Sequence, residues 1–371
     1  MLTGRPTRAE IDLGAIGHNV RHFKALLQPG TRLCAVVKAD GYGHGATAVA
    51  RAALAAGADH LAVAILDEAL LLREAGFTEP ILILGYTPPA ASALVVASRL
   101  TQTVWTLDQG QALAAAALAQ GRRAKVHLKI DTGMGRLGVF PAEAGPLAAA
   151  LIRLPGLDLE GVFTHFAQAD AFDKTSAGKQ FAAFEETLSA LNGQGVNPGL
   201  RHAANSAAAL EMPRTHLDMI RLGISLYGLA PSDECGQAAP LRPAMRFKTR
   251  VAFLKDVPAG TPLSYGGVYV TPGPARIATL PVGYADGWSR RLTGRAEVVV
   301  RGRRVKLVGR ICMDQCLADV TGLPDIEAGD EVLLFGGPEL PAEEVAAHLD
   351  TITYEVVCLV GKRVPRLYGE Y

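Results

Sequence analysis

The sequence predicts an α/β fold, in which a (β/α)8 TIM barrel is followed by a smaller, mostly-β C-terminal domain. The chain has 371 residues, which suits two domains better than one. Before residue 240, eight strand-helix repeats fit into about 230 residues, the count and length of such a barrel. After residue 240, strand-like runs follow one another closely, separated by glycine and proline turns. We therefore expect domains at residues 1–240 and 241–371, with the first few residues able to pack with the second domain.

The expected barrel strands are short and rich in leucine or β-branched residues, as strands buried on both faces should be. They are Leu33–Val37, His60–Ala64, Ile81–Gly85, Thr103–Thr106, Val126–Ile130, Glu160–Thr164, Leu200–Ala204 and Met219–Ile224. Helical patterns between them cover Ala46–Ala56, Leu66–Ala75, Gln109–Gln120, Glu143–Arg153 and Ala177–Leu191. A doubly wound open sheet is the alternative, but no G-x-G-x-x-G motif follows the first strand.

A polar connection flanked by Pro231, Pro240 and Pro243 is predicted to link the domains. The strands expected beyond it are Phe247–Leu254, Ala275–Leu280, Ala296–Val300, Val305–Val308, Cys316–Asp319 and Glu331–Phe335. Two short helices, Ala342–Leu349 and Tyr354–Gly361, are predicted to end the chain.

Composition excludes several classes of function. The formal net charge is +1 and no basic patch is present, so we expect no nucleic-acid partner. The alanine-rich run Ala112–Ala119 is too short to span a bilayer, and no apolar stretch follows Met1. Five widely spaced cysteines suit reduced thiols, so the cytoplasm is the expected compartment. Cys312 and Cys316 form a lone C-x3-C pair, which cannot complete a zinc site, and no metal is expected.

Polar residues gather at the carboxyl ends of the predicted strands, where barrels of this kind carry their chemistry. These residues are Lys38, Lys129, Arg136, His165, His202, Asn205, Ser206, Arg221 and Gly223. Their convergence on one rim predicts an active site there.

Lys38 follows a buried strand and enters the mouth of the barrel. Loss of hydration lowers the pKa of a lysine and makes its amine nucleophilic toward an aldehyde. Gly41, Gly43 and Gly45 would let backbone approach a ligand, and the Tyr42 hydroxyl can reach a phosphate oxygen. A lysine that forms an ion pair at the end of a strand is the alternative.

The loops after the seventh and eighth strands often hold phosphate in such barrels. Here they offer the Ser206 hydroxyl and the backbone N–H groups of Gly223 and Ile224. Asn205-Ser206 also has the composition of a helix N-cap, and both roles can hold together.

Arg221 stands in an apolar strand, where a guanidinium is costly to bury without a partner. A guanidinium facing the pyridine nitrogen of pyridoxal phosphate (PLP) would leave that nitrogen unprotonated and weaken the ring as an electron sink. Transamination would then be suppressed, as suits a racemase. A structural salt bridge is the alternative.

Seven motifs together resemble those of the alanine racemase family. They lie at residues 35–45 (AVVKADGYGHG), 129–138 (KIDTGMGRLG), 202–206 (HAANS), 221–228 (RLGISLYG), 263–267 (LSYGG), 281–287 (PVGYADG) and 309–315 (GRICMDQ). The resemblance extends from Ala9 to Glu355, so it covers nearly the whole chain.

The resemblance implies PLP-dependent racemisation of L-alanine and D-alanine by two bases, which supplies D-alanine for cell-wall synthesis. Lys38 would hold PLP and act as the base on the D-enantiomer. Tyr265 would be the base for the L-enantiomer, acting from the neighbouring subunit of a homodimer, because racemisation needs proton transfer on both faces of the α-carbon. Arg136 would contact the PLP phenolic oxygen and the substrate carboxylate. The backbone N–H of Met313, also from across the dimer interface, would hold that carboxylate.

Further roles are implied in the same way. The phosphate would be bound by Tyr42, Ser206, Gly223, Ile224 and Tyr354, with Asn205 beside them. His165 and His202 would form a hydrogen-bond chain that orients Arg221 and Tyr265. Lys129 matches a lysine that is carbamylated in some members, where the resulting anion positions Arg136. Tyr284 and Tyr354 would narrow the substrate entrance. The other histidines, His18, His22, His60, His127, His216 and His348, are interpreted as surface or core residues.

Other functions remain open at this point. Tyr265 alone would pass for an ordinary turn tyrosine. A broad-range amino-acid racemase or a PLP decarboxylase would use the same architecture, although the cysteine-containing motif expected of decarboxylases is missing. A PLP-carrier protein without turnover would resemble the barrel alone, whereas this chain also has the β-domain that carries Tyr265 and Met313.

Overall fold

The computed structural model describes residues 4–370, which form two compact units. The first unit contains residues 16–41 and 46–242, and the second contains residues 4–15, 42–45 and 243–370. We refer to them as the barrel unit and the β unit.

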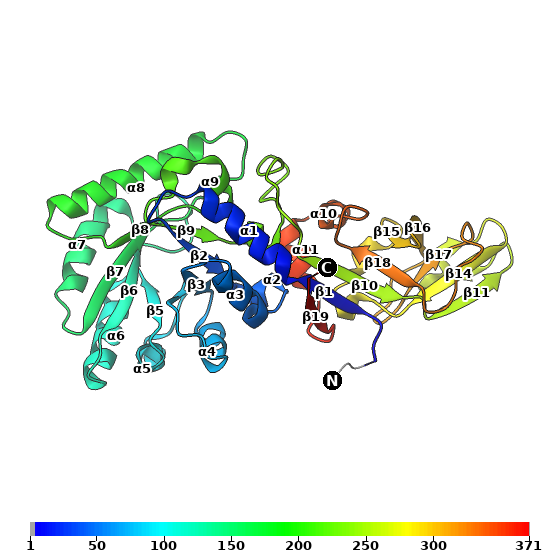
Figure 1. Ribbon diagram of the computed structural model, residues 1–371, viewed down its shortest axis with the longest axis horizontal. Coiled ribbons are helices and arrows are strands. Elements are labelled where there is room, and N and C mark those ends of the chain that lie inside the picture. The colour runs from blue at the N-terminus through cyan, green and yellow to red at the C-terminus, as the bar shows by residue number, and fades with distance from the viewer. Residues whose placement is uncertain (1–3, 371) are drawn as a thin grey trace. The chain divides into compact units, whose positions relative to one another are not determined.

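The barrel unit is built on eight parallel strands in the order β8-β7-β6-β5-β4-β3-β2-β9 (Figure 1). Their bounds are β2 Arg32–Val36, β3 His60–Val63, β4 Ile81–Ile83, β5 Thr101–Val104, β6 Ala124–Lys129, β7 Leu157–Phe163, β8 Leu200–His202 and β9 Met219–Leu222. The N–H groups of Asp218 and Arg221 donate to the carbonyls of Arg201 and Ala204, each at 3.0 Å, and join the two edge strands. The sheet is therefore the predicted barrel and not an open, doubly wound sheet.

Helices lie outside these strands, as the blue-to-green part of Figure 1 shows. They are α1 Leu13–Leu26, α3 Ala46–Ala55, α4 Leu66–Glu74, α5 Ser92–Ala97, α6 Leu107–Ala119, α7 Pro141–Ile152, α8 Thr175–Gly193 and α9 Ser206–Glu211. The sequence patterns did not predict α1 or α5, whereas α9 was anticipated only through its N-cap at Asn205-Ser206. Strand β5 was also predicted two residues too late. The hydroxyl of Thr106 accepts from the N–H of Gln109 and caps α6, so the strand has already ended before that residue.

The β unit contains a nine-stranded sheet in the order β11-β14-β17-β16-β15-β18-β10-β1-β19. Its strands are β1 Arg8–Asp12, β10 Met245–Arg250, β11 Phe253–Val257, β14 Ala275–Leu280, β15 Glu297–Val300, β16 Arg303–Val308, β17 Cys316–Asp319, β18 Glu331–Phe335 and β19 Arg366–Gly369. The β unit also contains a short hairpin of β12 (Pro262–Leu263) and β13 (Tyr269–Val270) and the helices α10 (Ala342–Leu349) and α11 (Thr353–Leu359). Helix α2 (Lys38–Tyr42) belongs to the barrel unit up to Gly41 and to the β unit at Tyr42. The N-terminal strand β1 pairs antiparallel with β10 and parallel with β19.

The single strand predicted at Phe247–Leu254 is wrong, because the chain changes partners in its middle. The N–H of Val251 donates to the carbonyl of Asp330, whereas the N–H of Ala252 donates to that of Thr279. As a result β10 pairs with β18 and β11 pairs with β14, at different places in the sheet.

The glycines after Lys38 have a structural role that their sequence pattern did not indicate. Ala39, Asp40, Gly41 and Tyr42 all have φ between 51° and 62°, so α2 is a left-handed turn. A side chain on Gly43 would collide with the carbonyl of Val357, and one on Gly45 would collide with the Tyr368 hydroxyl. Packing within the β unit therefore requires glycine at positions 43 and 45, whereas the predicted close approach of this backbone to a ligand stays a prediction.

Two further observations concern the described residues. Among residues 4–370, no helix combines the length and the apolar character needed to cross a membrane. The five cysteines in this part of the chain are all free thiols.

Candidate active site

Parallel strands deliver the predicted polar residues to one end of the barrel. Lys38 follows β2, Lys129 is the last residue of β6, and His165 follows β7. His202 ends β8 and Arg221 lies within β9, while Arg136 stands on the loop after β6 and is exposed. The carboxyl ends of these strands form the rim that the sequence indicated.

His165 lies at this rim, with Nη2 of Arg221 3.2 Å from its Nδ1. The pKa of His165 is held far below its ordinary value of 6.5, first because the imidazole is buried, and then because of nearby positive charges. These charges belong to Arg221, Lys129, Arg136 and Lys38. Positive charge at these positions disfavours a further charge on the imidazole, so His165 is a neutral ring at the barrel mouth.

The loop that carries Arg136 is shaped by Asp131, a residue that the sequence argument did not single out. One carboxylate oxygen of Asp131 accepts from the N–H groups of Gly133, Met134 and Gly135 at 3.0, 2.9 and 3.1 Å. Burial opposes ionisation of Asp131, but these three bonds outweigh it and lower the pKa of its carboxyl. The signal in the sequence was an aspartate directly before a glycine-rich turn.

Arg221 is buried and makes hydrogen bonds with both of its terminal nitrogens. Nη1 donates to Nδ1 of His202 at 2.7 Å. Nη2 lies 2.8 Å from the carbonyl oxygens of Thr164 and Ala203 and 3.2 Å from Nδ1 of His165. None of these partners is a carboxylate, so the contacts do not support a structural salt bridge. Burial lowers the pKa of Arg221 to about 10, which still leaves a cation at neutral pH.

Lys129 is buried, and its Nζ has no hydrogen-bond partner within the described residues. Burial, followed by the charges of Arg221 and Arg136, lowers the pKa of Lys129 well below its ordinary value of 10.5. Its amine is therefore much easier to deprotonate than that of an exposed lysine.

Phe163, which the sequence argument also missed, organises the neighbourhood of both cations. Its ring stacks on His202 with centroids 4.6 Å apart and 7° between the planes. Lys129 Nζ lies 4.7 Å and Arg221 Cζ 5.2 Å from the ring centroid. An aromatic face is favourable for a cation, so Phe163 offers partial compensation to positive charge on either side chain.

The predicted phosphate loops lie next to each other in the barrel unit. Asn205 caps α9, because its side-chain oxygen accepts from the N–H of Ala208 at 3.0 Å. Ser206 Oγ accepts from the N–H groups of Gly223 and Ser225 at 3.0 and 3.4 Å. Since Oγ is the acceptor in both bonds, the hydroxyl proton of Ser206 is left to be donated to an anion.

In the β unit, Tyr265 lies in a tight turn and is 66% exposed. Ser264, Gly266 and Gly267 have φ values of 62°, 74° and 54°, so the turn is left-handed on both sides of Tyr265. The Ser264 hydroxyl donates to the carbonyl of Arg310 at 2.6 Å. This bond fixes the Tyr265 turn to the loop that leads to Met313.

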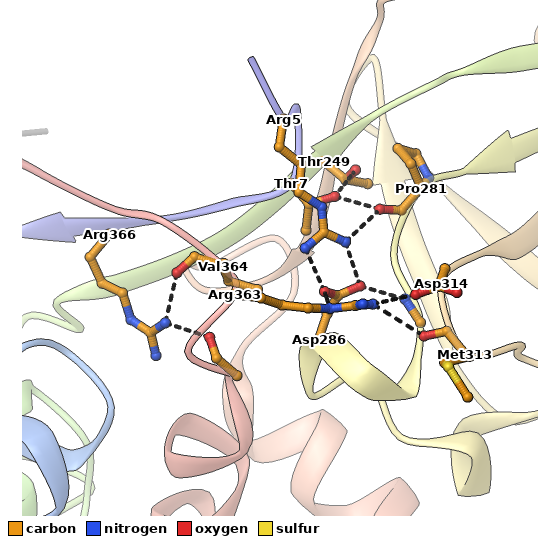
Figure 2. Close-up of polar contacts among 12 residues, drawn as sticks. Arg5, Thr7, Thr249, Pro281, Asp286, Met313, Asp314, Arg363, Val364 and Arg366 are labelled. Atoms are coloured by element: carbon orange, nitrogen blue, oxygen red, sulfur yellow. Dashed lines mark hydrogen bonds and ion pairs between the residues drawn. The ribbon is translucent and has the colours of Figure 1, made fainter. Parts of the chain in front are cut away.

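The Met313 loop is held by an ionic cluster around the buried Asp286, drawn in Figure 2. The N–H groups of Tyr284 and Ala285 donate to the carbonyls of Cys312 and Met313, each at 3.1 Å. Asp286 follows directly, and its fully buried carboxylate accepts from Arg5 and Arg363. Met313 and Tyr284 remain 52% and 40% exposed, so the cluster fixes the backbone and leaves these side chains accessible.

Arg363 extends this cluster to a second carboxylate, since it also donates to Asp314 at 2.7 Å. Burial opposes ionisation of Asp286, but Arg5, Arg363 and the N–H of Gly283 outweigh it and lower the pKa of its carboxyl. The sequence argument quoted Asp286 within a motif but gave it no role.

Tyr42 and Tyr354 lie together in the β unit, with ring centroids 6.2 Å apart. Tyr42 is buried, and burial raises the pKa of its phenol. Its hydroxyl therefore stays protonated and able to donate.

Comparison with known proteins gives one family for the whole chain. The family description "Alanine racemase, N-terminal domain" matches residues 11–231, and "Alanine racemase, C-terminal domain" matches residues 244–368. An alanine racemase of Desulfovibrio desulfuricans is 56% identical over 366 residues, with 99% of each chain covered. One from Desulfosudis oleivorans is 53% identical and covers 97% of this chain and 96% of its own.

Solved structures agree with these sequence relatives. An alanine racemase of Clostridium difficile 630 superposes with a TM-score of 0.95 at 42% identity, covering 98% of this chain and 96% of its own. One from Bacillus anthracis with bound L-Ala-P gives 0.93 at 41% identity, covering 100% and 96%.

Proposed function

Because the chain belongs to the alanine racemase family, it interconverts L-alanine and D-alanine, and we propose that it does so with PLP held covalently by Lys38. When bound, this cofactor withdraws electrons from the α-carbon and so makes the α-proton of the amino acid removable. The protein must then hold the cofactor, orient the substrate and supply proton donors and acceptors.

The residues at the barrel mouth suit a cofactor that carries an aldehyde and a phosphate. Lys38, Lys129, Arg136 and Arg221 concentrate positive charge around His165, and positive charge favours both a phosphate and the carboxylate of alanine. The free hydroxyl proton of Ser206, beside Gly223 and Ile224, supplies a donor for the phosphate. Tyr42 and Tyr354 would add their phenol hydroxyls.

Arg221 is proposed to face the pyridine nitrogen of the cofactor. Its partners His202, His165 and two backbone carbonyls hold the guanidinium in one orientation. A guanidinium has no proton to give up at neutral pH, so it can donate a hydrogen bond to that nitrogen without protonating it. This favours return of the proton to the α-carbon over transamination.

Tyr265 is proposed to be the second base, acting in a homodimer. Its side chain and that of Met313 are mostly exposed, although the loops that carry them are fixed by hydrogen bonds and ion pairs. Rigid, exposed aromatic and methionine side chains suit a protein interface. Each subunit would thus give Tyr265 and the Met313 N–H to the other subunit's site, and Tyr284 would narrow the entrance.

Lys129 is proposed to be carbamylated. Carbamate formation needs an unprotonated amine, and the lowered pKa of Lys129 supplies one. The carbamate would replace a buried amine that lacks hydrogen-bond partners with an anion close to Arg136 and Arg221. It would thereby orient Arg136 toward the substrate carboxylate and the cofactor's phenolic oxygen.

The observation that carries the proposal is that Lys38 and the hydrogen-bonded Arg221 both lie at the carboxyl ends of the parallel strands. Borohydride reduction followed by peptide mapping tests it, with the expectation that Lys38 alone carries the reduced cofactor. Lys38→Ala should abolish both the label and the conversion of L-alanine, followed by chiral chromatography. Lys125→Ala, at an exposed lysine of β6, is the matched control and should retain both.

Three results would contradict parts of the proposal. A label on another lysine would refute the role of Lys38. Bound PLP without exchange of the α-proton in deuterated water would indicate a carrier. Equal turnover of serine, lysine or arginine would indicate a broad-range racemase, and release of carbon dioxide a decarboxylase.

A further inference from the structure

A chain of buried polar side chains leads from Arg221 away from the mouth of the barrel. His202 Nδ1 accepts from Arg221 at 2.7 Å, and His202 Nε2 lies 2.9 Å from Nδ1 of His127. His127 Nε2 in turn lies 3.4 Å from a carboxylate oxygen of Glu160, within ion-pair distance although long for a hydrogen bond. All four side chains belong to the barrel unit, and both imidazoles are buried.

The chemistry of the two ends permits one arrangement of protons. Arg221 can only donate, so Nδ1 of His202 must be unprotonated, and its neutral ring must carry hydrogen on Nε2. That hydrogen points to Nδ1 of His127, which must accept, so the hydrogen of His127 is on Nε2 and faces Glu160. An ionised carboxylate can only accept. A donor-only group and an acceptor-only group therefore fix the tautomers of both imidazoles between them.

The ionisation states agree with this arrangement. Burial lowers the pKa of both imidazoles, His202 being lowered furthest, with the charge of Arg221 as its second cause. Burial alone would raise the pKa of Glu160, but its contacts with His127 and Lys125 lower it to about 2. At neutral pH these four side chains therefore comprise one cation (Arg221), two neutral imidazoles (His202 and His127) and one anion (Glu160).

The backbone of β7 is built to place Glu160 at this position. Val126 is opposite Leu159 and His127 is opposite Gly161, so Glu160 is an extra residue without a partner in the register. Such a bulge redirects a side chain that would otherwise follow the regular alternation. Here the carboxylate accepts from Thr101 at 3.1 Å and forms an ion pair with Lys125. Both partners stand near the amino ends of their strands, opposite to the rim of Lys38.

Gly161 leaves the space that His127 occupies. A Cβ at position 161 would lie 3.0 Å from two atoms of the His127 ring and 2.8 Å from the carbonyl of Leu200. These distances leave no room for a side chain, and the bulge and this glycine together create the place where imidazole and carboxylate meet.

We propose that Glu160 and His127 are positioning residues for Arg221, and that they act by fixing the tautomer of His202. The proposal rests on the proposed role of Arg221 toward the cofactor. If Glu160 became an amide, it could donate as well as accept, and the reversed arrangement would become available. His202 would then present an N–H to the N–H of Arg221, and the guanidinium would have to turn away from it.

Imidazole nitrogen resonances test the proposal directly, in holoenzyme labelled with ¹⁵N-histidine and compared with Glu160→Gln. In the unmodified protein we expect both His202 and His127 to be neutral and protonated at Nε2. In Glu160→Gln we expect a mixture of tautomers at His202 and a kcat roughly tenfold lower, the scale seen when an outer hydrogen-bond partner of a site residue is lost. Lys125→Gln is the control, because it removes the ion pair of Glu160 and keeps the carboxylate.

Each outcome supports or overturns the proposal. A protonated Nδ1 on His202 in the unmodified protein would overturn it, and this measurement stands even if the variant does not fold. Unchanged tautomers in a folded Glu160→Gln would overturn it as well, as would an equal shift in Lys125→Gln. Failure of borohydride to label Lys38 would instead refute the proposed function and leave the tautomers as described.

Discussion

Arg363 lies 2.6 Å from the buried carboxylate of Asp286 and at the same time reaches Asp314 of the loop that carries Met313. Asp286 also accepts from Arg5, so one carboxylate holds two guanidinium groups that come from opposite ends of the chain (Figure 2). The Met313 N–H is proposed to bind the substrate carboxylate, so this pair links the stability of the β unit to substrate binding.

Replacing Asp286 with asparagine should destabilise the protein and weaken alanine binding. Arg5 would lose its carboxylate partner and Arg363 would keep only Asp314, and breaking a buried ion pair in this way costs about 3 kcal/mol. Denaturant unfolding should show the loss, and the KM for alanine should rise more than kcat falls. Asp330→Asn, in the exposed pair with Arg301, is the control and should cost less than about 1 kcal/mol. Equal effects of the two variants would contradict the importance of the buried cluster.

Protonation of the Asp286 carboxyl should destabilise the folded protein in acid. Its pKa is lower in the folded chain than the ordinary value of 3.8, so the unfolded chain takes up a proton first as the pH falls. The stabilisation is complete at neutral pH and is lost as the pH drops below 3.8 through the folded value. Unfolding curves of the unmodified protein and Asp286→Asn should therefore converge in this acid range. Curves that stay parallel would show that the carboxyl does not titrate as described.

Lys129→Met should separate the effects of the free amine and the carbamate. We expect the unmodified protein to gain the mass of one carbon dioxide in bicarbonate buffer, and the variant to show no gain at this site. The variant should bind alanine about tenfold more weakly, because Arg136 loses an anionic partner. Intact mass spectrometry and KM measurements decide this, and Lys125→Met serves as the exposed control. Equal mass gains in the two proteins would contradict carbamylation of Lys129.

Without bicarbonate, Lys129 should make stability rise with pH, as Asp286 does, but over a higher pH range that ends near the ordinary lysine value. Its pKa is lower in the folded chain than the ordinary 10.5, so between these two values the unfolded chain binds more protons. The contribution of Lys129 to the free energy of unfolding therefore rises with pH up to about 10.5. Lys129→Met should remove that rise, which thermal unfolding at several pH values would reveal. A variant with the same slope as the unmodified protein would assign the effect to other groups.

Tyr265→Phe should remove proton transfer on one face of the substrate and leave the cofactor in place. We expect kcat for L-alanine to fall roughly a hundredfold or more, the range for loss of a general base. The absorbance of bound PLP should persist. Tyr269→Phe, a few residues along the same segment with its hydroxyl 3.5 Å from Asp319, should be nearly silent. A Tyr265→Phe enzyme with the original rate would exclude this phenol as a base.

Arg221→Lys should show that the shape of the guanidinium matters as well as its charge. Lysine keeps the positive charge but cannot reach His202 and the carbonyls of Thr164 and Ala203 at once. We expect a loss of about 2 kcal/mol in stability from unsatisfied buried groups, and at least tenfold lower kcat. Arg201→Lys, whose arginine pairs with Asp218 on the neighbouring strand, is the control. Similar activities for the two variants would argue against a special role for Arg221.

Local sequence patterns located a residue in the fold wherever its position along its own strand was enough to do so. Lys38, Lys129, His202 and Arg221 could be placed at one rim because parallel strands bring their carboxyl ends together. The strand boundaries were less secure. The pattern at Phe247–Leu254 is continuously strand-like, and the break in it depends on hydrogen bonds to Asp330 and Thr279, which are remote in sequence.

Residues that act through contacts between strands could not be recognised in this way. His127 was interpreted as a surface or core residue, and its place between His202 and Glu160 depends on a bulge in the neighbouring strand. Phe163 has the same appearance as any apolar strand residue until His202 and two cations are found on its ring. Arg5 and Asp286 are 281 residues apart, and no local pattern relates them.

The sequence by itself determined the barrel, the order of its strands and the residues at their carboxyl ends, because hydrophobic periodicity and strand polarity are local properties. Tertiary structure alone decided which charges lie together, which buried groups lack a hydrogen-bond partner and which nitrogen of each imidazole carries the proton. These properties depend on distances of a few ångströms between residues far apart in the chain. Electrostatic energy and hydrogen bonding change steeply over such distances, and periodicity in sequence contains no information about them.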